Sequence, residues 1–519
     1  TTSNHNKRKN MTTSALKRRS FLQGSLLAAA VIGSTPAVAA EAAKPKFDES
    51  FDVIVVGSGI AGTMAALSAA DKGANVLMIE KMSRLGGTSR ISGLNFACVG
   101  SPAQKAKGVK DTSEQLASDM YKVSGNMGDY EKALEMAKNT ARAEAFMTQR
   151  GVKWDGRLLK LGGHSQPRVL VSEGDGAGLL NALWTYMKGL KNVTVRTHVK
   201  ADEVLFNDKG VAVGVKVREK YFFDTPETDD NENKTGVEKR IEAKKGVIFA
   251  TGGYARDKAF RSSEVPFLAG VATTTNPGAT AGALKILVNA GAQPMHLSLF
   301  RFAYPLPTED MIWGMMVDPA TGRRFINEGL TRNALAQAVL LKRLQNGDKK
   351  PFIIYDEKSL GKFHNLNRVQ RSLNGLNGID GTMVKYDNLS ELCKAFGADP
   401  KVVEDELVKY NAMITEGKDA QFDKPLERSG RKVEALDLKG PLFAMVINPR
   451  LNYTPGGIRT DLQGRAIALK DGKPIEGLYV VGEASGGLHG QERMTGCSMP
   501  ECAVFGMIAG ESAAQRKSI

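Results

Sequence analysis

The chain has 519 residues, of which 42% are apolar, 24% are charged and 7% are aromatic. This length allows two to four domains, and the apolar fraction excludes a disordered or fibrous chain. The formal charge is +15, but six basic residues and no acidic residue precede residue 41, so the excess beyond that point is +9. No run of Lys and Arg is interleaved with aromatic residues, so the charge does not indicate a nucleic-acid-binding protein.

Residues 1–40 are predicted to form a leader that carries an export signal. Met11 is a candidate start, and the pair Arg18-Arg19 precedes an apolar stretch at 26–32 and small residues that end near Ala39. The apolar stretch is too short to span about 30 Å of hydrocarbon, so we expect a cleaved signal and no membrane span in the mature chain. The paired arginines resemble the twin-arginine class, which would place the folded protein in the periplasm. An ordinary secretory signal is the alternative.

A βαβ unit is predicted over residues 52–80. A β-branched run at 53–56 leads into the motif Gly57-Ser58-Gly59-Ile60-Ala61-Gly62, which is followed by a helical pattern at 64–72 and an apolar strand at 75–79. Gly57 allows a tight turn, Gly59 lets the backbone approach a pyrophosphate, and Gly62 lets the helix pack on the strand. Glu80 follows the second strand, where a carboxylate accepts hydrogen bonds from ribose hydroxyls. The pattern predicts a dinucleotide site.

Later glycine-rich segments indicate which dinucleotide binds. Two further buried strands that end in glycine turns are predicted at 246–253 and 477–484. A cofactor contacted by both ends of the chain is long and deeply buried, which favours FAD over a dissociable nicotinamide. The predicted cofactor-binding residues are Gly57, Gly59, Ala61, Gly62, Glu80, Lys81, Gly86, Gly87, Thr88, Ser89, Thr251, Gly252, Gly253, Glu483, Ser498 and Met499. The charged, turn-rich stretch 224–240 is predicted to form an exposed hairpin tip.

The four cysteines are Cys98, Cys393, Cys497 and Cys502, and they form no CxxC, CxxCH or metal-ligand spacing. We therefore expect no metal site, no cysteine-ligated cluster and no attached haem in this chain. Their scatter favours buried thiols over disulfides.

The order of the motifs resembles that of the flavoprotein subunits of fumarate reductase and succinate dehydrogenase, and among them the soluble fumarate-reductase-type flavoproteins. The resemblance covers about residues 50–515. It rests on the opening glycine motif and on Gly86-Gly87-Thr88-Ser89, LGGHS at 161–165, ATGG at 250–253, TNPGA at 275–279, RFINE at 324–328, Thr331-Arg332, Gly456-Gly457 and GGLHGQER at 486–493.

The resemblance implies an α/β fold with a discontinuous Rossmann-like FAD-binding domain at 47–295 plus 451–519. An α+β capping domain would be inserted at 296–450. Helical patterns at 333–345 and 401–415 agree with such an insert.

Reduction of an activated carbon–carbon double bond requires a hydride, a proton and positive charge that holds the activating carboxylate. The resemblance implies that Arg332 donates the proton and that Arg493 grips a substrate carboxylate with its guanidinium fork. It also places His489 close to the site, where a packing role is equally open, and makes Glu309 a candidate relay base. The implied substrate is an unsaturated carboxylate.

The chain departs from the fumarate reductases on the substrate side. Where these proteins place a histidine before a proline, this chain has Tyr304, and where they place a histidine pair it has Asn452-Tyr453. Fewer donors then face a second carboxylate, so we predict a monocarboxylate such as urocanate, an acrylate or an aryl acrylate. Urocanate reductases resemble this chain at Tyr304. The simpler interpretation is that each tyrosine only packs in the core, with its hydroxyl group hydrogen-bonded to the protein.

Three alternatives stay open at this point: a fumarate reductase proper, a dehydrogenase of a ketosteroid-like or cyclic substrate, and a non-catalytic flavin electron carrier. The retained Arg332 and Arg493 speak against the steroid substrate. Since no CxxCH is present, electrons are expected from a separate c-type cytochrome or another periplasmic donor, as in anaerobic electron transport. Neither Thr88 nor Ser89 offers a histidine for covalent attachment, so FAD is expected to be non-covalent.

Overall fold

The computed structural model describes residues 46–518 except 225, 226, 228, 348, 364, 365 and 377–380. The predicted leader at 1–40 lies outside the described residues. Within the described part, no helix is both long enough and apolar enough to cross a membrane. All four cysteines are free and buried.

An eight-stranded sheet carries the dinucleotide-binding part of the chain. Six strands follow one another in the order β21 (Arg465–Ile467), β22 (Pro474–Val480), β9 (Val237–Phe249), β1 (Glu49–Val56), β2 (Val76–Ile79) and β6 (Val193–Arg196), and β7 (Val199–Phe206) and β8 (Ala212–Glu219) extend from β9. β1 pairs in parallel with both β2 and β9, and β22 pairs in parallel with β9. The predicted parallel Rossmann-like sheet is therefore confirmed.

The two faces of this sheet belong to different apolar clusters, because successive side chains of a strand point to opposite sides. Val53 and Val55 pack with the helices α1 (Ile60–Asp71), α5 (Tyr130–Thr148), α6 (Asp175–Met187) and α14 (Ser498–Gln515). Ile54 and Val56 pack with α8 (Gly282–Asn289) and the far strands. Both faces are covered, which explains why the strand sequence 53–56 is uniformly apolar.

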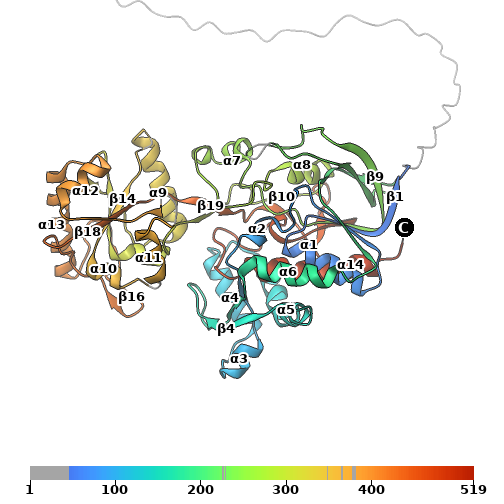
Figure 1. The fold of residues 1–519 in the computed structure, drawn as a ribbon, viewed down its shortest axis with the longest axis horizontal. Helices are drawn as coiled ribbons and strands as arrows, with labels where there is room; N and C mark the ends of the chain where they lie inside the picture. Colours follow the sequence, from blue (N-terminus) through green and yellow to red (C-terminus); the bar gives the residue numbers. More distant parts are fainter. Residues whose placement is uncertain are drawn as a thin grey trace, which may run out of the picture. The chain divides into compact units, whose positions relative to one another are not determined.

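Helices α1 and α14 lie side by side, although most of the chain separates them in sequence (Figure 1). The contact depends on two glycines of α14. A Cβ added at Gly506 would lie 2.3 Å from the Ala61 oxygen, and one at Gly510 would lie 2.3 Å from the Ala65 oxygen. This close crossing brings the C-terminal segment to the glycine motif that begins α1.

A three-stranded sheet, β3 (Asn95–Ala97), β5 (Val169–Ser172) and β4 (Trp154–Leu159), is linked to the same part. Helix α3 (Pro102–Ala106) contacts β4, α4 (Ser113–Val123) contacts α5, α2 (Gly87–Arg90) contacts α6, and α7 (Lys258–Glu264) follows β9.

A second sheet lies between residues 315 and 446 and has its own apolar cluster, from Leu306 to Ile447. Its strands are antiparallel in the order β13 (Arg323–Arg324), β12 (Met315–Asp318), β14 (Phe352–Asp356), β18 (Leu442–Val446) and β15 (Val384–Tyr386). The accompanying helices are η2 (Thr308–Trp313), α9 (Arg332–Gln345), α10 (Glu357–Gly361), α11 (Leu366–Leu373), α12 (Leu389–Phe396) and α13 (Pro400–Glu416).

Two short strand pairs join the insert to the rest of the chain. β10 (Pro294–Met295) pairs with β20 (Gly457–Ile458), and β11 (Arg301–Ala303) pairs with β19 (Arg450–Tyr453), both antiparallel. The predicted boundaries at 295 and 451 fall within these pairs. Phe300 and Phe302 belong to the cluster on the dinucleotide sheet and not to that of the insert. Helix α9 packs on both clusters, because Ala336 and Leu340 face one and Leu335 and Val339 face the other.

Candidate active site

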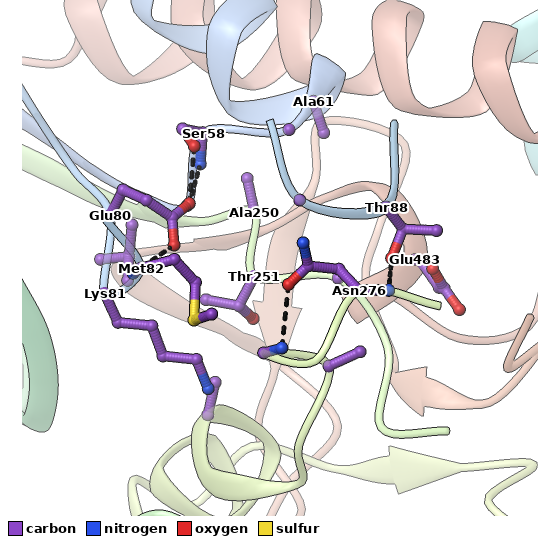
Figure 2. A pocket seen from close by; sticks show the side chains of 18 of the residues that line it. Ser58, Ala61, Glu80, Lys81, Met82, Thr88, Ala250, Thr251, Asn276 and Glu483 are labelled. Atoms are coloured by element: carbon purple, nitrogen blue, oxygen red, sulfur yellow. Dashed lines mark hydrogen bonds between the residues drawn. The ribbon is translucent and has the colours of Figure 1, made fainter. Parts of the chain in front are cut away.

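A cavity runs past the carboxyl ends of β1, β2 and β9, where an open parallel sheet binds its ligands. Its walls come from the glycine motif, from the segments 79–82 and 87–89, from Thr251 and Gly252 after β9, and from Glu483 (Figure 2). The loop 276–280 closes another side, where the Asn276 backbone N–H donates to Thr88 Oγ1 over 3.2 Å.

The turn between β1 and α1 admits no side chain at two of its glycines. Gly57 has φ +105°, and a Cβ there would lie 2.4 Å from the Ala250 oxygen. A Cβ at Gly62 would lie 1.9 Å from the Gly57 oxygen. Because the motif already forms the first turn of α1, the helix begins at Ile60, four residues before the periodicity predicts. Its N-terminus lines the cavity and suits a pyrophosphate.

Glu80 is held at the end of β2 by three hydrogen bonds. Its Oε2 accepts from Ser58 N over 3.2 Å and from Ser58 Oγ over 2.6 Å, and its Oε1 accepts from Met82 N over 2.9 Å (Figure 2). The carboxylate is thereby fixed at the cavity wall, in the position where ribose hydroxyls would donate to it.

Lys81 reaches across the cavity to a buried aspartate. Its Nζ lies 2.9 Å from Asp230 Oδ2 and 2.9 Å from Thr280 Oγ1, and Thr280 Oγ1 donates to Asp230 Oδ1 over 2.8 Å. Asp230 is only 1% exposed. The stretch 224–240 does connect the hairpin strands β8 and β9, but the prediction of a wholly exposed tip is wrong at Asp230, because an ion pair draws it inward.

A second cavity of about 400 Å³ adjoins the first and shares Thr88, Ser89, Glu483 and Cys502 with it. The structure brings four of the predicted catalytic and substrate residues to this cavity. They are Arg332, Arg493, Tyr304 and Tyr453. The predicted cofactor residues Ser498 and Met499 also line this second cavity and not the first.

Arg332 is the first residue of α9 and is half-buried, and Thr331 caps the helix by accepting from Ala334 N. The Arg332 side chain has no hydrogen bond or ion pair within the described part of the chain. Arg493 is buried against the Tyr453 ring, 4.7 Å from its centroid, and Nη1 donates to Ser498 Oγ over 3.0 Å. Burial lowers the pKa of Arg493, and the charge of Arg332 adds to this effect.

The two tyrosines use their hydroxyls differently. Tyr453 donates to Glu501 Oε2 over 2.6 Å, and the same oxygen lies 2.9 Å from His489 Nε2. Contrary to the prediction for a substrate residue, His489 does not line the cavity, because it lies behind Tyr453 on this buried carboxylate. The Tyr304 hydroxyl is buried with no partner among the described residues. Burial raises the pKa of Tyr304 far above its ordinary value.

Glu309, the predicted relay base, lies in η2 and is half-buried, but it is not among the residues that line the cavity. The Glu309 side chain lies against Gly162, because a Cβ added at Gly162 would be only 3.0 Å from Glu309 Oε1. A second half-buried carboxylate is Glu492, which precedes Arg493 in the chain. Burial raises the pKa of Glu492, and the nearby Arg332 and Arg301 oppose that effect.

A family of FAD binding domains matches residues 52–499 of this sequence. The chain belongs to this family. Within it, the chain is similar to the acrylate reductase flavoprotein subunit of Shewanella woodyi, with 33% identity over 95% of this chain and 97% of the relative. It is also similar to the urocanate reductase of Eggerthella lenta, with 28% identity over 89% of this chain and 74% of the relative.

Among solved structures, the open conformation of a flavocytochrome c3 fumarate reductase superposes with a TM-score of 0.75. The two share 26% sequence identity over 90% of this chain and 79% of that one. The protein is thus an FAD-dependent oxidoreductase of the fumarate reductase type, which acts on CH–CH bonds.

The residues of the first cavity fit the cofactor of this flavoprotein family. The turn at Gly57 leaves room for a pyrophosphate at the N-terminus of α1, and Glu80 is oriented for a ribose. Most predicted cofactor residues line the cavity, namely Gly57, Gly59, Ala61, Glu80, Lys81, Gly87, Thr88, Ser89, Thr251, Gly252 and Glu483. Gly62, Gly86 and Gly253 are not among the lining residues, and they shape the turns behind the wall.

Glu483 stands between the two cavities of the flavoprotein. It accepts hydrogen bonds from Thr454 N over 2.9 Å and from Thr454 Oγ1 over 3.1 Å. Burial raises the pKa of Glu483 to about 7, although these bonds and the charge of Arg493 oppose the shift. This carboxyl group therefore titrates near neutral pH, beside the arginine that is predicted to hold substrate.

Sequence reasoning missed several residues that line the two cavities. Ser58, Lys200, Asp230, Asn276 and Thr280 line the first, and Arg301, Arg368, Asn452 and Thr495 line the second. Asn276 lies inside the 275–279 motif, so the sequence did contain a signal that could have predicted its place in the cofactor cavity. No local pattern marks Arg301 or Asp230, because strand pairing and a long-range ion pair bring them to the site.

Proposed function

We propose that the protein reduces the carbon–carbon double bond of an α,β-unsaturated monocarboxylate, with an acrylate, an aryl acrylate or urocanate preferred over fumarate. One observation supports this most strongly. Arg301, Arg332 and Arg493 line one cavity beside the dinucleotide site, and none of them has an acidic partner among the described residues. Arg301 and Arg493 are buried, and buried cations without an ion-pair partner are costly, so the arrangement favours an anionic ligand.

The chemistry divides among a few groups. FAD bound in the first cavity, once reduced by the external electron donor, would supply the hydride that the β-carbon of the substrate accepts. Arg493 would hold the carboxylate and stabilise the negative charge that develops on it during reduction. Arg332 would deliver a proton to the α-carbon, which the electron pair of the broken π bond accepts. Glu309, together with Glu492, would return a proton to Arg332.

The preference for a monocarboxylate rests on the tyrosine side of the cavity. Tyr453 offers its ring and not its hydroxyl, which is occupied by Glu501. Tyr304 keeps one hydroxyl for the rest of the substrate. The relative named for acrylate reduction, at 33% identity, supports the same choice. A tyrosine-based dehydrogenation of a ketosteroid-like substrate is disfavoured, because three cationic side chains would face a neutral ring.

The substrate test uses the purified holoenzyme reduced with dithionite or a viologen. We expect reoxidation by acrylate, methacrylate, cinnamate or urocanate to be faster than reoxidation by fumarate or an enone steroid. Faster reoxidation by fumarate than by every monocarboxylate would overturn the preference. Reoxidation by the steroid alone would overturn the reaction class.

Replacement of the proposed acid gives the second test. Arg332→Ala should keep bound FAD and lose at least about 1,000-fold in turnover, a typical scale for removing a positioned proton donor. Arg323→Ala is the matched control, because the Arg323 side chain is 60% exposed on the insert. Full turnover in Arg332→Ala would show that another group donates the proton.

We also propose that the protein works in the periplasm as part of anaerobic electron transport, with non-covalent FAD and a separate c-type cytochrome or similar donor. The twin-arginine pattern and the lack of a CxxCH in the sequence support this proposal. Cell fractionation with N-terminal sequencing tests it, since cleavage near Ala39 is expected. Release of FAD by acid precipitation tests the mode of attachment. Retention of FAD on the precipitated chain would show a covalent link.

A further inference from the structure

We infer that Arg301 is a second arginine ligand of the substrate carboxylate and acts together with Arg493. The identity of the ligand rests on the proposed function. Arg301 is the first residue of β11 and lies opposite Tyr453 of β19 in the strand register. Its side chain lines the 400 Å³ cavity, and the residue is only 4% exposed.

The guanidinium group of Arg301 is only partly engaged by the protein. Nε donates to the Arg493 backbone oxygen over 3.0 Å, Nη1 to Asn452 Oδ1 over 3.2 Å, and Nη2 to Thr495 Oγ1 over 3.0 Å. All three acceptors are neutral. A guanidinium group carries five N–H bonds, so two have no acceptor among the described residues, in a side chain that lines the cavity. They suit the two oxygens of a carboxylate.

Arg301 forms no ion pair among the described residues. Its charged neighbours are the cations Arg493 and Arg332 and, on the opposing side, the carboxyl groups of Glu492 and Glu309. Burial lowers the pKa of Arg301 well below the ordinary value; Arg493 and Arg332 add to this effect, and the two carboxyl groups only partly oppose it. A bound anion would relieve this unfavourable charge distribution.

Arg261 shows what a purely structural buried arginine looks like in this protein. It is also 4% exposed, but its nitrogens donate to four backbone oxygens, those of Ala255, Leu268, Ala269 and Val271. It lines neither of the two cavities. Arg301 differs in both respects, since it has fewer acceptors and faces open space beside the dinucleotide site.

Arg301 and Arg493 belong to the same end of the cavity, because the first donates to the backbone of the second. The segment that carries Arg493 is also held from the other side, where His164 Nε2 lies 2.7 Å from the Thr495 oxygen. Arg493 itself has an Nε without a partner. The two guanidinium groups therefore lie on two segments in direct contact, and each has N–H groups without an acceptor among the described residues, which favours a single shared carboxylate over two separate ones.

The competing interpretation is that Arg301 only braces the segment 493–495. A comparison of an acid with its neutral amide separates the two. We expect Arg301→Gln to lower kcat/KM for acrylate about 100-fold, mostly through KM, and to change kcat/KM for acrylamide less than threefold. Arg301→Lys keeps the charge and should recover part of the loss. An equal fall for the acid and the amide in Arg301→Gln would show a brace and overturn the inference.

A control variant and a binding measurement test the role of Arg301 without relying on turnover. Arg261→Gln should lower thermal stability and leave the acid-to-amide ratio unchanged. Propionate and propionamide serve as unreactive probes of the oxidised holoenzyme, followed by the flavin absorption spectrum. We expect Arg301→Gln and Arg301→Lys to keep FAD, and Arg301→Gln to weaken propionate binding at least tenfold. Unchanged propionate binding in Arg301→Gln would overturn the inference, whether or not the enzyme reduces acrylate. Failure of the wild-type enzyme to reduce acrylate would contradict only the proposed function.

Discussion

Both cavities are lined by residues from distant parts of the chain, but the dinucleotide cavity (the first) takes nearly half of its lining from the opening βαβ unit and the turn after it, at 56–61, 79–82 and 87–89, whereas the substrate cavity (the second) has no lining residue from that βαβ unit. The first depends on backbone geometry, as at Gly57 and Gly62, and on one oriented carboxylate, Glu80. The second depends on charged and aromatic side chains from several elements of the insert and the sheet. A cofactor site of the first kind is fixed with the fold, while a substrate site of the second kind changes by single residues.

The largest effect is expected where the backbone of the dinucleotide cavity is altered. Gly57→Ala places a Cβ 2.4 Å from the Ala250 oxygen, so the turn must shift away from the pyrophosphate position. We expect the FAD-to-protein ratio to fall at least about tenfold, with a marked loss of thermal stability. The ratio is read from the absorption spectrum of the purified protein.

Gly73→Ala is the matched control for that substitution. Gly73 also has positive φ, +81°, but a Cβ there meets nothing within 4 Å. The control should cost about 1 kcal/mol through backbone strain alone and keep its FAD. Equal FAD loss in both variants would mean that left-handed strain, and not the close approach, defines the turn.

A second, smaller effect separates the two tyrosines of the substrate cavity. Tyr453→Phe removes a hydrogen bond to the buried Glu501 carboxylate, which is worth about 1.5–3 kcal/mol. We expect a lower unfolding temperature and little change in KM. Tyr304→Phe removes a hydroxyl without a protein partner, so stability should hold while KM rises severalfold. If both variants changed the unfolding temperature and KM in the same way, the assignment of Tyr453 to packing and Tyr304 to substrate binding would be contradicted.

The smallest effect concerns pH. Glu483 has a pKa raised by burial to about 7, so it becomes ionised as the pH rises through 7. The new negative charge competes with the substrate carboxylate for Arg493, and KM for an acid should rise severalfold between about pH 6 and 8. Glu483→Gln keeps an acceptor for Thr454 and should abolish this rise, whereas KM for an amide should not follow pH in either protein. A persistent rise in Glu483→Gln would assign the titration to another group.

The sequence by itself determined the parallel sheet, the FAD family and the residues of the opening βαβ unit. These features depend on contacts between neighbours in the chain. Gly57, Gly62 and Glu80 lie within one strand–helix–strand unit, so their spacing carries the geometry. The resemblance to the family added Arg332 and Arg493, which the structure brings to one cavity.

Only the tertiary structure decided which further side chains meet at that cavity and which do not. Arg301 is there because β11 pairs with β19, and Asp230 is buried because Lys81 pairs with it across 149 residues. His489 is absent from the lining because Glu501 on α14 holds it behind Tyr453. Such contacts join segments that are remote in sequence. Their partners follow from strand register and burial, for which the chain carries no local signal.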